Sequence, residues 1–114
     1  LYESRDGALW ITTEGLGVTR LAGGVFESFS TAEGLPDNEV GDVFETPDGT
    51  LIVDTRLGAV RWDDGRFIVE TALPHRGDRA RTVLGRAADG AIWFRDAAGV
   101  HRFAGHAIAR TLSI

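Results

Sequence analysis

The chain has 114 residues, which is the size of a single domain that can bury one hydrophobic core. A formal charge of −5 and a pI near 5.1 argue against a nucleic-acid-binding protein, because such proteins normally carry a basic surface. Cysteine is absent, which excludes disulfides and thiol catalysis, and no run of 18 apolar residues predicts a membrane span.

The start of the sequence bears on its origin. It contains no methionine, not even at position 1, and no basic-then-apolar signal peptide begins at Leu1. We therefore expect the chain to be a piece of a longer protein.

Four short strands are predicted in the first third of the chain, at 1–4, 8–12, 18–21 and 25–30. The first turn falls at Asp6-Gly7. Asp-Gly is a strong hairpin signal because a type I′ turn needs positive φ at both central residues, which Asp and Gly tolerate best. The other two turns fall near Gly17 and in the glycine pair at 23–24.

The next segment, residues 32–40, reads AEGLPDNEV and is too polar and too rich in turn residues to be core. We expect it to link the outermost strand of one four-stranded unit to the innermost strand of the next. Gly34 and Pro36 should fix this crossing, because their backbone preferences suit an irregular path.

The remaining strands repeat the first four. They are predicted at 41–46, 50–54, 59–62, 66–71, 82–87, 91–95, 100–103 and 107–112. The matching positions recur every 41 or 42 residues: Asp6, Asp48 and Asp89; Gly17, Gly58 and Gly99; Arg20, Arg61 and Arg102; Phe26, Phe67 and Ile108. The first copy has one extra residue between its Asp-Gly pair and its next glycine. Repeats of this length, each a four-stranded meander, predict an all-β fold of three β-propeller blades at 1–39, 40–80 and 81–114.

The first copy, DGALWITTEGLGVTRL followed by FESFSTAEGLPDNEV, resembles the two-component regulator propeller repeat. The family pattern is roughly D-G-x-L-W-I-G-T, then G-L/V-x-R, an aromatic strand and G-L-P-x-N-x-V. The second copy departs from it at Ile52 and in ALPHRGDRARTV, and the third keeps Trp93 but ends at Ile114. The resemblance implies a non-catalytic sensor propeller in the extracytoplasmic region of a bacterial signalling protein. It implies no cofactor.

Basic residues supply the candidate ligand-binding site. His75, Arg76 and Arg79 lie in the only basic cluster of an acidic chain, and Arg56 and Arg95 are predicted in turns that face the same propeller mouth in adjacent blades. Guanidinium groups bind carboxylate, sulfate or phosphate with paired hydrogen bonds, so a saccharide or an anionic small molecule is the expected ligand. The alternative is a solvated loop balanced by Asp78.

Other residues suit structural roles better. Trp10 and Trp93 share one strand position and are expected to fill the space between neighbouring sheets, although sugar stacking is the alternative. His101 and His106 are interpreted as a surface pair without a metal, since no carboxylate is fixed nearby by the pattern. No nucleophile, phosphate-binding or dinucleotide motif supports an enzyme.

Three hypotheses remain: a ligand- or partner-sensing propeller segment, a structural or engineered repeat module that assembles into a ring, and a carbohydrate-active enzyme on a propeller frame. Paired carboxylates facing the channel would favour the third. Because propellers close with about four to eight blades, three blades are expected to self-associate or to join further blades of the parent chain. Leu9, Ile11, Ile92 and Phe94 are predicted to line the open faces.

Overall fold

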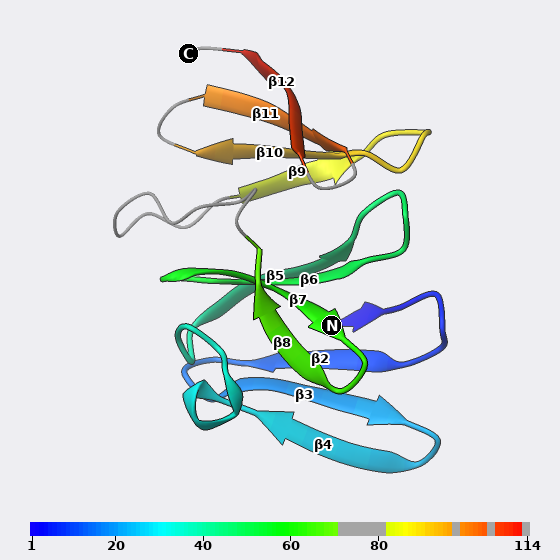
Figure 1. The fold of residues 1–114 in the computed structure, drawn as a ribbon, viewed down its shortest axis with the longest axis vertical. Helices are drawn as coiled ribbons and strands as arrows, with labels where there is room; N and C mark the ends of the chain where they lie inside the picture. Colours follow the sequence, from blue (N-terminus) through cyan, green and yellow to red (C-terminus); the bar gives the residue numbers. More distant parts are fainter. Residues whose placement is uncertain (71–81, 97–98, 105–106, 113–114) are drawn as a thin grey trace.

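A computed structural model describes residues 1–70, 82–96, 99–104 and 107–112 (Figure 1). Twelve strands form three antiparallel sheets of four strands each, which confirms the all-β prediction. The strands are β1 (Tyr2–Glu3), β2 (Leu9–Thr13), β3 (Gly17–Ala22), β4 (Val25–Phe29), β5 (Val40–Glu45), β6 (Leu51–Thr55), β7 (Gly58–Asp63), β8 (Arg66–Val69), β9 (Thr82–Arg86), β10 (Ile92–Asp96), β11 (Gly99–Ala104) and β12 (Ala107–Leu112). The described residues contain one short 3₁₀ helix, η1 (Thr31–Glu33), and no α-helix.

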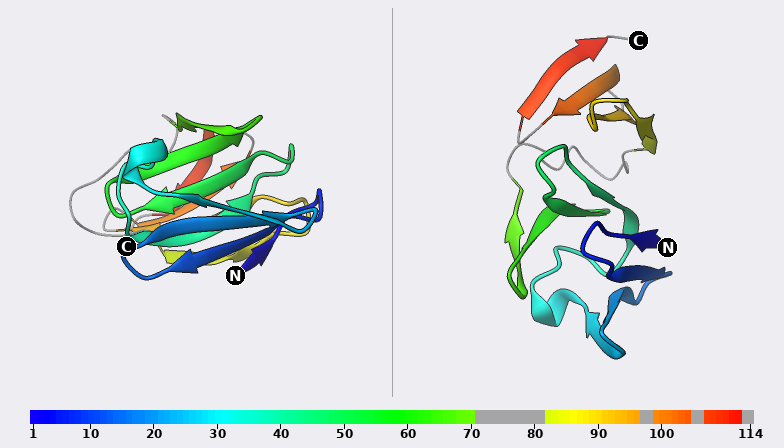
Figure 2. Two further views of the ribbon diagram at one scale, coloured as in Figure 1. Left: turned by 90° about the horizontal axis from the view of Figure 1, so that it is seen from below. Right: turned by 90° about the vertical axis from the view of Figure 1, so that its right-hand side faces the viewer.

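Each sheet is a meander in which neighbouring strands follow one another in the chain. We call them sheet 1 (β1–β4), sheet 2 (β5–β8) and sheet 3 (β9–β12). Figures 1 and 2 show the sheets stacked along the longest dimension of the molecule, with sheet 2 in the middle. Strand β5 contacts both β2 and β9, so strands near the start of each sheet connect the stack.

The three Asp-Gly turns join the first two strands of each sheet, but their geometry differs from the prediction. The Gly7 N–H donates to the Ser4 carbonyl at 2.9 Å, and Gly7 has φ of 88°. Asp6 does not have positive φ, since Asp64 is the only described non-glycine residue that does. The predicted type I′ turn is therefore wrong here, because five residues (4–8) separate β1 from β2 and only Gly7 among them is left-handed.

Positive φ at both turn positions, as in a type I′ turn, occurs instead in the β3–β4 and β7–β8 hairpins. Gly23 and Gly24, between β3 and β4, have φ of 57° and 78°. Asp64 and Gly65, between β7 and β8, have φ of 49° and 94°. Both loops contain two residues, for which this turn matches the right-handed twist of the strands.

The first core cluster lies between sheets 1 and 2. Trp10, 1% exposed, contacts Trp62 with ring centroids 5.2 Å apart and Phe67 at 6.4 Å. Phe29 contacts the same two rings at 5.1 and 5.2 Å. Edge-to-face contacts dominate this cluster, which suits the charge distribution of aromatic rings.

The second core cluster lies between sheets 2 and 3. Phe44 and Ile52 of sheet 2 pack in one cluster with Ile92, Phe94 and Phe103 of sheet 3. Ile92 and Phe94 are 2% and 1% exposed, so the prediction that they line an open face is wrong. Strand β6 is buried at all five positions because sheet 2 has a neighbouring sheet on each side, which explains its unbroken apolar start.

The link between β4 and β5 is held by its own polar residues. Ser30 caps η1 by accepting from the Ala32 N–H, and Glu33 accepts from the Ser30 N–H at 2.7 Å. Gly34 ends the turn in the left-handed region with φ of 106°. Leu35 is then buried in the first core cluster. The link is therefore held by the hydrogen bonds of its cap and by the packing of Leu35.

Replacing Gly34 and Pro36 together with alanine should lower the free energy of unfolding by about 1 to 3 kcal/mol, because both residues fix the backbone path. Gly41→Ala is the matched control. Gly41 lacks positive φ, and an added Cβ would lie 3.8 Å from the nearest atom, the Asp54 carbonyl oxygen. Urea unfolding should separate the two variants, and equal midpoints would contradict this role for the link.

Candidate functional site

An open groove of about 540 Å³ lies where the link passes the β2–β3 and β6–β7 turns. We call it the link-end groove. Its lining residues come from sheets 1 and 2 and from the link between them: Thr12, Glu14, Gly15, Glu39, Val40, Gly41 and Arg56. Turns and the link thus supply the charged groups, while core packing between the sheets fixes the positions of the elements that carry them.

Arg56, one of the predicted ligand-binding residues, lies in this groove. Its Nε donates to Asp37 at 3.0 Å, and its Nη2 lies 2.9 Å from the same carboxylate oxygen. The Arg56 N–H also donates to the Glu39 carbonyl at 2.9 Å. Its side chain is 48% exposed, so the guanidinium is oriented by the link and still accessible to solvent.

Asp37 is oriented by the link itself. Its carboxylate accepts a hydrogen bond from the Glu39 N–H at 3.0 Å, and this bond, followed by Arg56, lowers the pKa of Asp37. The next residue, Asn38, accepts from the Gly17 N–H through its carbonyl and from the Thr31 N–H through its side chain, both at 2.9 Å. The residue after Asp37 is therefore bonded both to the start of β3 and to the start of η1, which fixes the part of the link that carries Asp37.

The other predicted site residues are placed differently. Arg95 lies inside strand β10 and is exposed, so its placement in a turn was wrong. Register explains the error: Asp96 pairs with Gly99 as Thr55 pairs with Gly58, so Arg95 corresponds to the buried Asp54 and not to Arg56. The predicted site residues His75, Arg76 and Arg79 lie outside the described residues.

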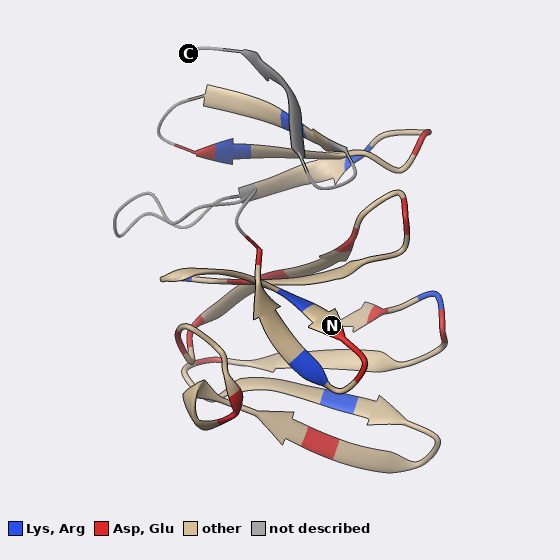
Figure 3. Cartoon of the chain, in the orientation of Figure 1, with Lys and Arg blue, Asp and Glu red and all other residues tan. Residues whose placement is uncertain are grey.

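Two groove residues, Glu14 and Glu39, were not anticipated. Glu14 occupies the β2–β3 turn, which has three residues where the β6–β7 turn has two. The extra residue of the first copy was visible in the repeat spacing, and it marks this turn as the one that differs. Glu39 follows the link asparagine directly and lines the groove together with Arg56. Figure 3 shows acidic residues along the link.

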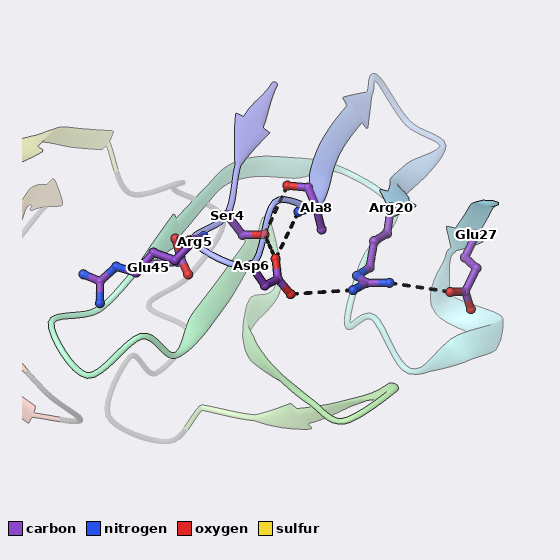
Figure 4. Close-up of polar contacts among 7 residues, drawn as sticks. All are labelled: Ser4, Arg5, Asp6, Ala8, Arg20, Glu27 and Glu45. Atoms are coloured by element: carbon purple, nitrogen blue, oxygen red, sulfur yellow. Dashed lines mark hydrogen bonds and ion pairs between the residues drawn. The ribbon is translucent and has the colours of Figure 1, made fainter. Parts of the chain in front are cut away.

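The opposite end of the sheets carries the Asp-Gly turns. In Figure 4 the Asp6 carboxylate accepts from the Ser4 hydroxyl and from the Ala8 N–H at 3.0 Å. These bonds lower the pKa of Asp6, with the Ser4 bond contributing most. Asp48 accepts in the same way from Thr46 and Thr50. These aspartates stabilise their own turns, which is a structural role.

Arg20, which recurs as Arg61 and Arg102, connects this end to the core. Its guanidinium carbon lies 5.8 Å from the Trp10 ring centroid and 5.6 Å from that of Trp62, and its Nη2 is 3.7 Å from Asp6. A cation held over two aromatic rings is favourable when partly desolvated. The repeated arginine thus has a structural explanation.

One polar network spans all three sheets. The Tyr2 hydroxyl donates to Glu45 Oε1 at 2.9 Å, and the Arg5 N–H donates to the same oxygen at 3.0 Å. Arg86 Nη2 donates to the Tyr2 hydroxyl at 3.2 Å and to the Glu45 carbonyl at 3.0 Å. Burial, together with the bond to Glu45, raises the pKa of Tyr2. This network fixes β1, β5 and β9 relative to one another.

His101 is buried, so its interpretation as part of a surface pair is wrong. It is 2% exposed, its Nε2 lies 2.8 Å from Asp96 Oδ1, and its ring is 4.9 Å from that of Phe94. The repeat alternation places it on the face of β11 that packs against sheet 2. His106 lies outside the described residues. Among the described residues, no group of three or more His, Cys, Asp or Glu side chains could hold a metal ion.

No family model matches the chain, and no curated protein matches it significantly. Within the part of the chain that the structure describes, no helix has the length and apolar character needed to cross a membrane.

Proposed function

We propose that the chain is a non-catalytic β-propeller segment of a bacterial signal-transduction sensor, which binds a saccharide in the link-end groove. The sensor role rests on the resemblance of the repeat, and its site would be extracytoplasmic in the parent protein. The observation that carries the binding role is the groove, in which Arg56, Glu14 and Glu39 converge from separate segments.

Three features support the propeller arrangement in this proposal. Each sheet is a four-stranded meander, each repeat unit packs on the next, and β5 contacts both neighbouring sheets. The described link, between β4 and β5, lies at the end of sheet 1 opposite its Asp-Gly turn. Ligand sites commonly lie at such ends because turns can vary without disturbing the sheets.

The groove chemistry favours a hydroxyl-rich ligand over a strong anion. Asp37 engages two N–H groups of Arg56, out of the five that a guanidinium carries. The donors at Nη1 and the acceptors of Glu14 and Glu39 match sugar hydroxyls, which both donate and accept. A carboxylate or sulfate would meet two like charges, which disfavours it.

The test is a binding screen of the chain against neutral and uronic-acid oligosaccharides, followed by titration calorimetry on the best binder. Glu39→Gln and Arg56→Ala should each weaken binding at least about tenfold, since each removes a charged hydrogen-bonding group. Arg66→Ala, an exposed arginine on β8 outside the groove lining, is the control and should bind normally.

Tighter binding of the uronic acids would redirect the ligand class to anions. The absence of any binder, or affinities unchanged by both groove variants, would refute the binding role. Glu39→Gln keeps the side-chain size and leaves the Asp37–Arg56 pair in place, so a loss of binding in that variant is not explained by a disrupted link.

A second candidate function, a module that assembles through its sheet faces, is favoured by one observation. Phe26 on β4 is 67% exposed, although the equivalent residue of sheet 2, Phe67, packs against the first core cluster.

A further inference from the structure

Sheet 1 carries an apolar surface on the side that faces away from sheet 2. Leu9 pairs with Leu21, and Leu21 pairs with Phe26, so these three side chains share one face, which Ile11 joins two residues along β2. We call this set the outer face of sheet 1. Leu9, Ile11 and Leu21 are partly exposed and Phe26 is 67% exposed. Figure 1 shows sheet 1 at one end of the stack.

The corresponding face of sheet 2 is covered by sheet 1. Its residues stand 41 or 42 positions later in the chain: Leu51, Val53, Trp62 and Phe67. All four belong to the first core cluster, in which Trp10 and Phe29 cover Trp62 and Phe67. The same pattern that forms an outer face in sheet 1 is thus an internal interface in sheet 2.

The corresponding face of sheet 3 is also covered. Ile92, Phe94 and Phe103 stand another 41 positions along and pack against Ile52 and Phe44 of sheet 2. In sheets 2 and 3, this face is therefore buried beneath the neighbouring sheet. The surface that covers it comes in each case from the opposite face of that neighbour.

Sheet 3 presents such a covering surface on its own outer face. Trp93 stands at the repeat position of Trp10 and Ile52, both of which cover the next sheet. Trp93 pairs with Arg102 as Trp10 pairs with Arg20, and Arg102 bonds Asp89 as Arg20 bonds Asp6. The outer face of sheet 3 thus repeats the tryptophan and arginine of the surface that covers Trp62 and Phe67.

We propose that the outer face of sheet 1 binds the outer face of sheet 3 in a second copy of this chain. In this contact Trp93 of one copy lies against Leu21 and Phe26 of the other, as Trp10 lies against Trp62 and Phe67 within the chain. A second copy is the occupant because the structure itself supplies the complementary face, with matching register, tryptophan and arginine.

The contact is head to tail, since each copy contributes a different surface. Two copies form a closed dimer if both pairs of faces meet at once. The inference does not depend on the proposed function, because the residues of the link-end groove lie outside both faces. Sugar binding can fail while self-association holds, and the reverse.

The first experiment is light scattering with size-exclusion chromatography on the chain at about 5 to 100 micromolar, which lies above a dissociation constant of about 10⁻⁶ M. The unmodified chain should be dimeric, and Phe26→Asp should be monomeric at all concentrations. Leu16→Asp is the matched control: Leu16 is 70% exposed in the β2–β3 turn of the same sheet, and its variant should remain dimeric.

The second experiment mixes variants that block opposite faces. Trp93→Asp blocks the sheet 3 face, and Val100→Asp on the same face serves if Trp93→Asp fails to give the β-sheet circular dichroism of the unmodified chain. Each blocked variant should be monomeric alone, and a 1:1 mixture of Phe26→Asp with either should form dimers through its one intact contact.

Two results would overturn the proposal. A monomeric unmodified chain at 100 micromolar, about a hundred times a micromolar dissociation constant, would mean that another segment or partner covers the face. Dimers that survive Phe26→Asp, or blocked variants that do not associate on mixing, would show a contact through other surfaces.

Discussion

Replacing Gly17 with alanine should lower the free energy of unfolding by about 3 kcal/mol or more, the upper range for a single substitution. Gly17 has φ of 86°, and an added Cβ would lie 2.1 Å from the Phe29 carbonyl oxygen. That oxygen belongs to the backbone of the neighbouring strand, so it cannot move without distorting the sheet. The Gly17 N–H also donates to Asn38, which ties the link to sheet 1.

Gly15→Ala provides the matched control for this prediction. Gly15 stands in the same turn with φ of 71°, but an added Cβ would have no atom within 4 Å. Its cost should be about 1 kcal/mol, from the left-handed backbone alone. Guanidinium unfolding followed by tryptophan fluorescence measures both variants, and similar midpoints would show that the contact with Phe29 does not determine the cost.

The sequence allowed the strands to be predicted closely, because the repeat supplied three readings of each. The predicted segment 8–12 is β2 at Leu9–Thr13, and 107–112 matches β12. Turn geometry was harder to predict from the sequence. Asp6-Gly7 and Asp64-Gly65 share the same two letters, yet only the second is a two-residue loop with positive φ at both positions. Loop length decides the turn type, and it depends on strand pairing that the letters do not encode.

Which face of each strand is covered could not be predicted from one repeat alone. Alternation places Trp93 opposite Ile92 and Phe94, but it does not say which side faces sheet 2. The prediction that Ile92 and Phe94 lie on an open face was wrong because these residues are on the side that packs against sheet 2. The structure resolves the question because Leu51 and Ile52, adjacent in β6, belong to different core clusters.

The candidate site was only partly predictable. Arg56 was identified from its charge, and it lies in the link-end groove. Its partner Asp37 stands 19 residues earlier in the chain, so the pair forms only because the link folds back over the β6–β7 turn. The predicted position of Arg95 in a turn was wrong because charge alone does not fix strand register. Glu14 and Glu39 had no motif to mark them, and only packing brings them to one groove.

Trp10→Ala should cost about 3 to 5 kcal/mol, the usual range for deleting a large buried aromatic side chain. Trp10 is 1% exposed and contacts Phe29, Trp62 and Phe67. Its removal would leave a cavity between sheets 1 and 2 and would also remove one of the two rings beneath Arg20. The buried Nε of Arg20 has no hydrogen-bond partner, so it depends on these rings for favourable surroundings.

Trp93→Ala is the comparison, because Trp93 holds the same repeat position but is only partly buried in the chain itself. Both substitutions should be made in Phe26→Asp, so that self-association does not stabilise Trp93. The Trp93 variant should then lose about 1 kcal/mol, in proportion to the smaller apolar area it removes from contact. Chemical denaturation gives both values. A loss of unfolding free energy for Trp93→Ala as large as that for Trp10→Ala would contradict this prediction. It would mean that the outer face of sheet 3 is already covered within one chain.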